Sequence, residues 1–132
     1  MENQQDLLDH FDELDEQIGE LVDNARSGAD LSETLRQGQS LVAQTLSQYA
    51  IAHGKPMPAT GDLLEIFKGF VKGDPSLNTV RDNVRELVYY QNCLDTGRED
   101  ALPVKPAMMV AHTTRHIYFY LRSRVEQESK LD

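Results

Sequence analysis

The stretch from Pro106 to Glu126 constrains the fold of this chain more than any other, because it contains no glycine and no internal proline. Two sets of side chains recur in it at the spacings that place residues on one helical face. The first set is Val110, Thr114, Ile117, Leu121 and Val125, and the second is Met108, Met109, His112, His116 and Phe119. A helix that is apolar around most of its circumference is normally buried among other helices. We therefore expect an all-α, single-domain bundle of four to five helices with a buried C-terminal helix.

Four further helices are predicted upstream. Residues 5–25 carry apolar side chains at alternating steps of four and three, which is the spacing of a heptad seam. The other segments are expected at residues 31–53, 61–72 and 74–94, with Asp30, Thr60 and Asp74 as their caps. Glycine and proline residues separate these segments, and no long segment alternates with period two, so we expect no sheet.

The length of 132 residues fits one domain, spanning residues 1–132, and we expect the polar residues 127–132 to fray. No apolar run is long enough to cross a bilayer, and the acidic N-terminus lacks the layout of a signal peptide. The single cysteine, Cys93, cannot form an intramolecular disulfide, which agrees with a reducing compartment. These features predict a cytoplasmic protein that does not associate with membranes.

The charge is unevenly distributed along the chain. Residues 1–30 contain ten acidic residues and one basic residue, Arg26, which accounts for the whole net charge of −9. A surface of this kind repels phosphate backbones, so general nucleic-acid binding is disfavoured. The acidic helix at residues 5–25 could instead bind a basic protein partner.

Two histidines, His112 and His116, lie one helical turn apart, so their imidazoles point the same way and could bind a divalent metal such as zinc. Zinc needs at least one further ligand, which His53 or His10 could supply only by folding nearby. The alternative is that His112 and His116 are packed polar residues without a cofactor.

A second candidate site is a patch that binds a phosphate or a nucleotide. Arg115, Arg122 and Arg124 could make bidentate contacts to phosphate, and Tyr118 and Tyr120 could supply a stacking surface. The alternative is that these arginines pair with the acidic first helix, in the same chain or in a partner copy.

The segment AHTTRHIYFYLRSR, residues 111–124, resembles the last metal-binding helix of DinB/YfiT-type bundles, which carries an HxxxH pair before an LR-like segment. That resemblance implies a third histidine ligand on an earlier helix, which would be His53. The Gly-Gln that commonly follows the second histidine is replaced here by Ile117 and Tyr118.

Residues 39–103 are similar in layout to HEPN domains, over about half of the chain. The matching pieces are SLVAQTLSQYAIAHG, KPMPATG, DLLEIFKGF and LNTVRDNVRELVYYQNCLDTG. The resemblance implies a helical bundle that often forms a symmetric homodimer. Active members are ribonucleases with an arginine, four to six residues and then a histidine, a spacing that none of the four histidines has here. The nuclease residues therefore cannot be carried over.

These observations favour a non-enzymatic, HEPN-like protein that acts by protein–protein association as a homodimer, with no catalytic residues and no cofactor. The alternatives are a metal-binding bundle that uses His112 and His116, and a domain that binds a nucleotide or another phosphorylated ligand.

Overall fold

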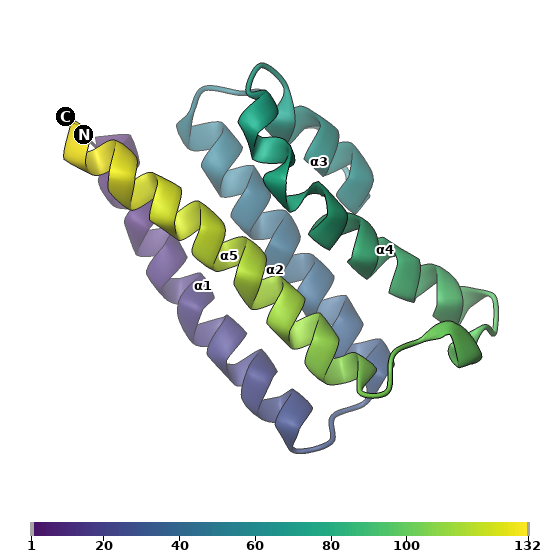
Figure 1. The fold of residues 1–132 in the computed structure, drawn as a ribbon. Coiled ribbons are helices and arrows are strands. Elements are labelled where there is room, and N and C mark those ends of the chain that lie inside the picture. Colours follow the sequence, from purple (N-terminus) through teal and green to yellow (C-terminus); the bar gives the residue numbers. More distant parts are fainter. Residues whose placement is uncertain (1, 132) are drawn as a thin grey trace.

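Five α-helices and two short 3-10 helices are present in the computed structural model, which describes the backbone of residues 2–131 and the side chains of residues 4–128 (Figure 1). In chain order they are α1 (Glu2–Arg26), α2 (Leu31–Ala52), α3 (Leu63–Val71), η1 (Pro75–Val80), α4 (Arg81–Asp95), η2 (Glu99–Ala101) and α5 (Pro106–Leu131). The described range contains no strand. The prediction of an all-α bundle is confirmed.

Helix α5 packs against both α1 and α2, which also contact each other, so these three helices form the centre of the bundle (Figure 1). Tyr49 near the end of α2 bonds to Arg124 near the end of α5, so α2 and α5 run parallel. Tyr118 of α5 donates to the carbonyl of Phe11 near the start of α1, so α1 runs antiparallel to α5. Helices α3 and α4 contact each other and cover another side of α2.

The heptad seam of α1 lies inside the molecule. Its side chains are all buried, at 6% exposure or less, and they are Leu7, Phe11, Leu14, Ile18, Leu21 and Ala25. Because α1 contacts α2 and α5, this seam packs within one chain. The seam cannot therefore form the contact of the expected homodimer, and any such contact has to use another surface.

The two faces of α5 differ in burial. On the first face Val110, Ile117 and Leu121 are fully buried, as predicted. On the second face His112 and His116 are exposed, Phe119 is 51% exposed and Met109 is 39% exposed. The prediction of a helix buried around most of its circumference is confirmed for the first face and wrong for the second, because no other helix of the described chain covers that side.

Helix boundaries differ from the sequence prediction where local capping decides them. Asp62, and not Thr60, caps α3, since its carboxylate accepts from the backbone amides of Leu64 and Glu65. Asp74 caps the 3-10 helix η1, and α4 begins only at Arg81. The Asp30 cap of α2 is confirmed by its bond to the Glu33 amide.

The expected fraying after Glu126 is not observed as far as Leu131, where α5 ends. The side chain of Glu128 holds this end, because Tyr49 donates to one of its oxygens at 2.7 Å and His53 contacts the other at 2.7 Å. Among the described residues, none of the helices combines the length and the apolar character needed to cross a membrane.

Candidate functional site

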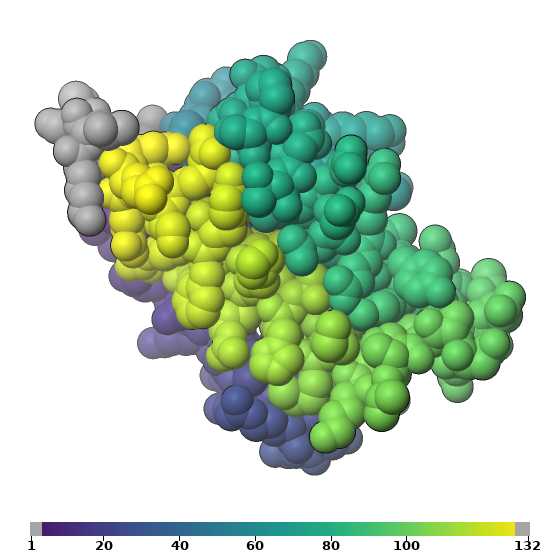
Figure 2. Space-filling view, in the orientation of Figure 1, coloured from purple at the N-terminus to yellow at the C-terminus, as the bar shows by residue number. Residues whose placement is uncertain are grey.

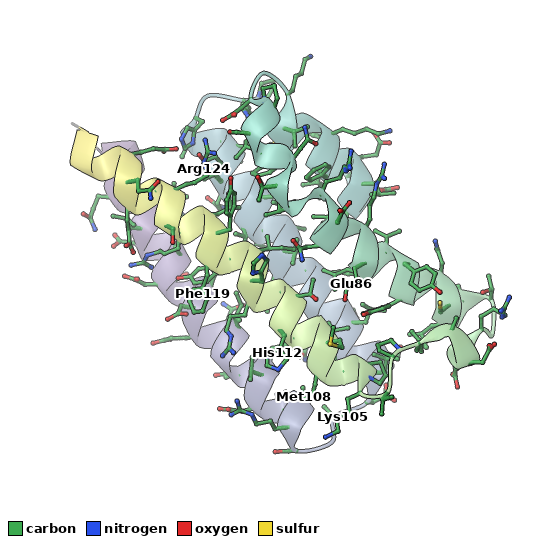
Figure 3. All side chains as sticks on the ribbon, in the orientation of Figure 1. Glu86, Lys105, Met108, His112, Phe119 and Arg124 are labelled. Carbon is green, nitrogen blue, oxygen red and sulfur yellow. The ribbon has the colours of Figure 1, made fainter. Side chains whose placement is uncertain are left out.

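The outward face of α5 carries a stripe of four side chains, Met109, His112, His116 and Phe119, which we call the α5 stripe. Their steps of three, four and three residues keep them on one side of the helix. All four are exposed. In the space-filling view α5 forms a band across the front face, with α1 on one side and α4 on the other (Figure 2). The stick view shows His112 and Phe119 on α5 (Figure 3).

The two imidazoles of the α5 stripe have no hydrogen-bond partner within the described part of the protein. Arg115 lies between them in sequence, but its guanidinium sits 6.0 Å above the Phe119 ring. Glu86 of α4 reaches this region, since Thr113 donates to it at 3.3 Å. His112 and His116 are therefore available to a ligand from solvent.

His53 lies at the other end of α5 from this pair. Its ring stacks on Tyr49, its Nδ1 lies 2.8 Å from the Tyr49 carbonyl, and its Nε2 lies 2.7 Å from Glu128. Both ring nitrogens therefore face oxygen atoms of the protein and are engaged within the fold. Glu128 follows His116 by about 18 Å along the helix axis at the usual helical rise.

The structure therefore does not bring His53 together with His112 and His116. His10 lies exposed on α1, beside Gln48 and Ile51 of α2. Nowhere in the described residues do three or more His, Cys, Asp or Glu side chains form a group that could hold a metal ion. Among the residues with described side chains, the third ligand expected from the resemblance is thus missing from the pair.

The predicted phosphate patch is largely engaged within the protein. Tyr118 is 2% exposed and its hydroxyl donates to the Phe11 carbonyl, and burial raises its pKa. Arg122 bonds to Asp12 of α1 at 2.8 Å and to Glu126 at 2.9 Å. The acidic first helix thus pairs with Arg122 in the same chain, and Arg115 remains the accessible member of the patch.

Sequence reasoning missed a polar network around Arg124. Its guanidinium donates to the Tyr49 hydroxyl at 3.2 Å, to Ser76 at 2.9 Å and to Asp74 at 3.0 Å. These bonds join α5 to α2 and to η1. Burial raises the pKa of the Tyr49 hydroxyl, which keeps it protonated as a donor to Glu128. The partners lie far apart in sequence, so no local pattern could have indicated them.

The Asp74 carboxylate makes stability depend on pH. Hydrogen bonds from Ser76 lower its pKa, and the positive charge of Arg124 adds to this effect. A lowered pKa in the folded state contributes stability above the ordinary carboxyl pKa of about 3.9, and that stability is lost as the pH falls through the folded value. Asp74→Asn, which keeps the cap, should therefore show a shallower fall in Tm between pH about 5 and about 3 than the unmodified protein.

The control for this prediction is Asn78→Ala in η1, which removes a side-chain hydrogen bond to the Pro75 carbonyl but no titrating group. We expect its Tm to follow the same pH profile as the unmodified protein. Equal profiles for all three proteins would show that the Asp74–Arg124 pair adds nothing to acid stability.

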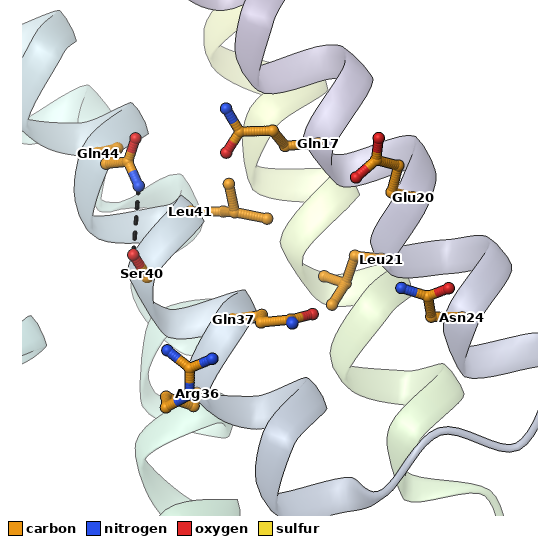
Figure 4. Close-up of a pocket in the computed structure, with 9 residues that line it drawn as sticks. All are labelled: Gln17, Glu20, Leu21, Asn24, Arg36, Gln37, Ser40, Leu41 and Gln44. Atoms are coloured by element: carbon orange, nitrogen blue, oxygen red, sulfur yellow. Dashed lines mark hydrogen bonds between the residues drawn. The ribbon is translucent and has the colours of Figure 1, made fainter.

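A second surface feature is an open groove of about 240 Å³ between α1 and α2 (Figure 4). Side chains with amide groups dominate its lining, namely Gln17, Asn24, Gln37 and Gln44. One charge of each sign, Glu20 and Arg36, lies at its edges, and Gln44 donates to Ser40. Amides neither exchange protons nor attack as nucleophiles at neutral pH, so this lining offers hydrogen bonds and no acid–base chemistry.

No family model, no curated protein and no solved structure matches this chain. Any conclusion about function therefore depends on the residues and geometry described above.

Proposed function

We propose that this protein is a cytoplasmic, non-enzymatic bundle that acts by protein–protein association as a homodimer, with the α5 stripe as its contact surface. The observation that carries the proposal is the exposure of Phe119 and Met109 at helical spacing on the central helix. Exposed apolar side chains that share one face are typical of interaction surfaces, whereas isolated ones need no explanation. The buried thiol of Cys93 agrees with a reducing compartment.

The HEPN-like layout of residues 39–103 supports the same proposal, because the resemblance implies symmetric homodimers. The acidic face of α1 supplies a second surface, which would suit a basic protein partner. It carries exposed carboxylates beside the α5 stripe, among them Asp12, which is 65% exposed at its side chain. A partner with basic side chains around an apolar centre would complement both features.

Two other functions are proposed as alternatives. The exposure of His112 and His116 favours a metal-binding function, as the DinB/YfiT-like segment implies. A nucleotide-binding function is less well supported, since Tyr118 is buried and Arg122 already pairs with two carboxylates.

The association is tested by replacing Phe119 with serine and measuring the mass of the purified protein by size-exclusion chromatography with light scattering. We expect the unmodified protein to be a dimer and Phe119→Ser to be a monomer, because the substitution removes exposed apolar area from the proposed contact. Phe119 is half-exposed, so the fold should survive its loss.

Ile51→Ser is the matched control, because Ile51 is a comparably exposed apolar residue, at 57%, on α2. We expect this variant to remain a dimer. An unmodified protein that is monomeric both with and without an added divalent metal would contradict the homodimer, and equal loss of dimer in both variants would move the contact away from the α5 stripe.

A further inference from the structure

We infer that His112 and His116 form half of a zinc-class metal site, which the same two residues of a second copy of this chain complete. The inference builds on the proposed homodimer and names what holds it together. The two imidazoles lie one turn apart on the outside of α5, and among the described residues neither is used by the fold. Such a pair binds a divalent cation from one side and leaves the remaining coordination positions open.

The missing ligands have to come from outside the chain. No third His, Cys, Asp or Glu of the described residues joins the pair, and His53 is held by Tyr49 and Glu128 far along α5. Structural zinc is almost always bound by four ligands in a tetrahedral arrangement. In a symmetric dimer each copy contributes the same two histidines, so the contact contains four. A second copy is therefore the occupant that completes the site.

The spacing of the α5 stripe supports this geometry. Steps of three, four and three read the same in both directions along the helix. The two histidines are therefore central and the two apolar residues are terminal whether the paired helices run parallel or antiparallel. In either case the four imidazoles meet at the centre, and Met109 and Phe119 enclose the metal from both ends.

The charges around the pair are compatible with a cation. Arg115 is the nearest base, and its guanidinium is drawn over the Phe119 ring. Helix α4 presents Glu86 beside Thr113, and helix α1 presents Asp15 close enough to act on the Tyr118 hydroxyl. Both neighbouring helices thus place a carboxylate against a residue of α5 that is close in sequence to the pair.

The apolar area of the proposed contact is too small to hold two copies together, so the dimer needs the metal as well. Stable interfaces bury roughly 800 Å² on each partner. Two exposed apolar side chains per copy, Met109 and Phe119, form only a small part of such an area. Coordination by four imidazoles would supply the missing affinity.

The test measures mass and metal content of the full chain, without an affinity tag, in zinc chloride and in EDTA at pH about 7.5. We expect a dimer with one zinc per two chains in zinc, and a monomer in EDTA. His112→Ala and His116→Ala should each weaken zinc binding about tenfold or more and abolish the zinc-dependent dimer. His10→Ala, which alters another exposed histidine on α1, should behave like the unmodified protein.

Each other outcome decides against the inference in a distinct way. One zinc on each monomer, or equal effects of His10→Ala and His116→Ala, would overturn it. A dimer that persists in EDTA and ignores zinc would overturn it and leave the proposed function standing. A monomer under all conditions would overturn both the metal bridge and the homodimer.

Discussion

Replacing Gly38 with alanine is expected to lower the free energy of unfolding by about 2 kcal/mol, although alanine is the better helix former. A Cβ atom at Gly38 would lie 2.8 Å from Val110 Cγ1 and 2.9 Å from Thr114 Oγ1. Both neighbours are buried on α5 and β-branched, so their side chains have little freedom to move away. Overpacking of this kind costs up to about 3 kcal/mol, and the gain in helix propensity returns about 1 kcal/mol.

Gly19→Ala is the matched control, because Gly19 also lies within a helix but nothing lies within 4 Å of its Cβ position. The same substitution there should raise the free energy of unfolding by about 0.5–1 kcal/mol. Urea denaturation of both variants measures whether each substitution lowers or raises the free energy of unfolding. Stabilisation by both substitutions would mean that α2 and α5 do not meet closely at Gly38.

Replacing Arg124 with methionine is expected to cost about 2 kcal/mol, even though arginine is a charged residue at the edge of the core. Methionine keeps much of the aliphatic stem but removes the donors that Tyr49, Ser76 and Asp74 use. Those partners sit on α2, on η1 and at the cap of η1, so the substitution loosens three elements together. The Arg124 side chain is 25% exposed and that of Asp74 is 35% exposed, so solvent screens part of the charge pair and limits the loss.

The control is Arg122→Met, two positions away on the same helix and similarly exposed, at 27%. Its carboxylate partners Asp12 and Glu126 are 65% and 53% exposed, so their ion pairs are each worth less than about 1 kcal/mol. Chemical denaturation should therefore rank Arg124→Met clearly below Arg122→Met in stability. An equal loss in both variants would show that the Arg124 network acts only as a set of surface ion pairs.

The apolar periodicity of α1 and of the inner face of α5 was read correctly from sequence. Steps of three and four place Phe11, Ile18 and Leu121 on inner faces whatever the partners are, and all three are buried. The second face of α5 was assigned wrongly because Met109 and Phe119 follow the same steps. Periodicity groups side chains on one face but does not say whether another helix covers that face.

For the candidate site too, some features follow from the sequence and others only from the packing of the helices. The turn-by-turn pairing of His112 and His116 follows from helix geometry alone, and the sequence was sufficient to find it. The position of His53 at the far end of α5 depends on where α2 ends and which way it runs. The network of Arg124 likewise depends on η1 returning to the end of α5.

By itself, the sequence determined the helical class, the inner face of α1, the first face of α5 and the charge of α1, because these depend on residues within a few turns of one another. Only the tertiary structure decided that the α1 seam is used within one chain and that the α5 stripe faces solvent. It also decided that Arg122 pairs with Asp12 and that His53 lies apart from His112 and His116. These outcomes depend on how whole helices pack, and packing is set by the shapes of all the faces together and not by any one segment.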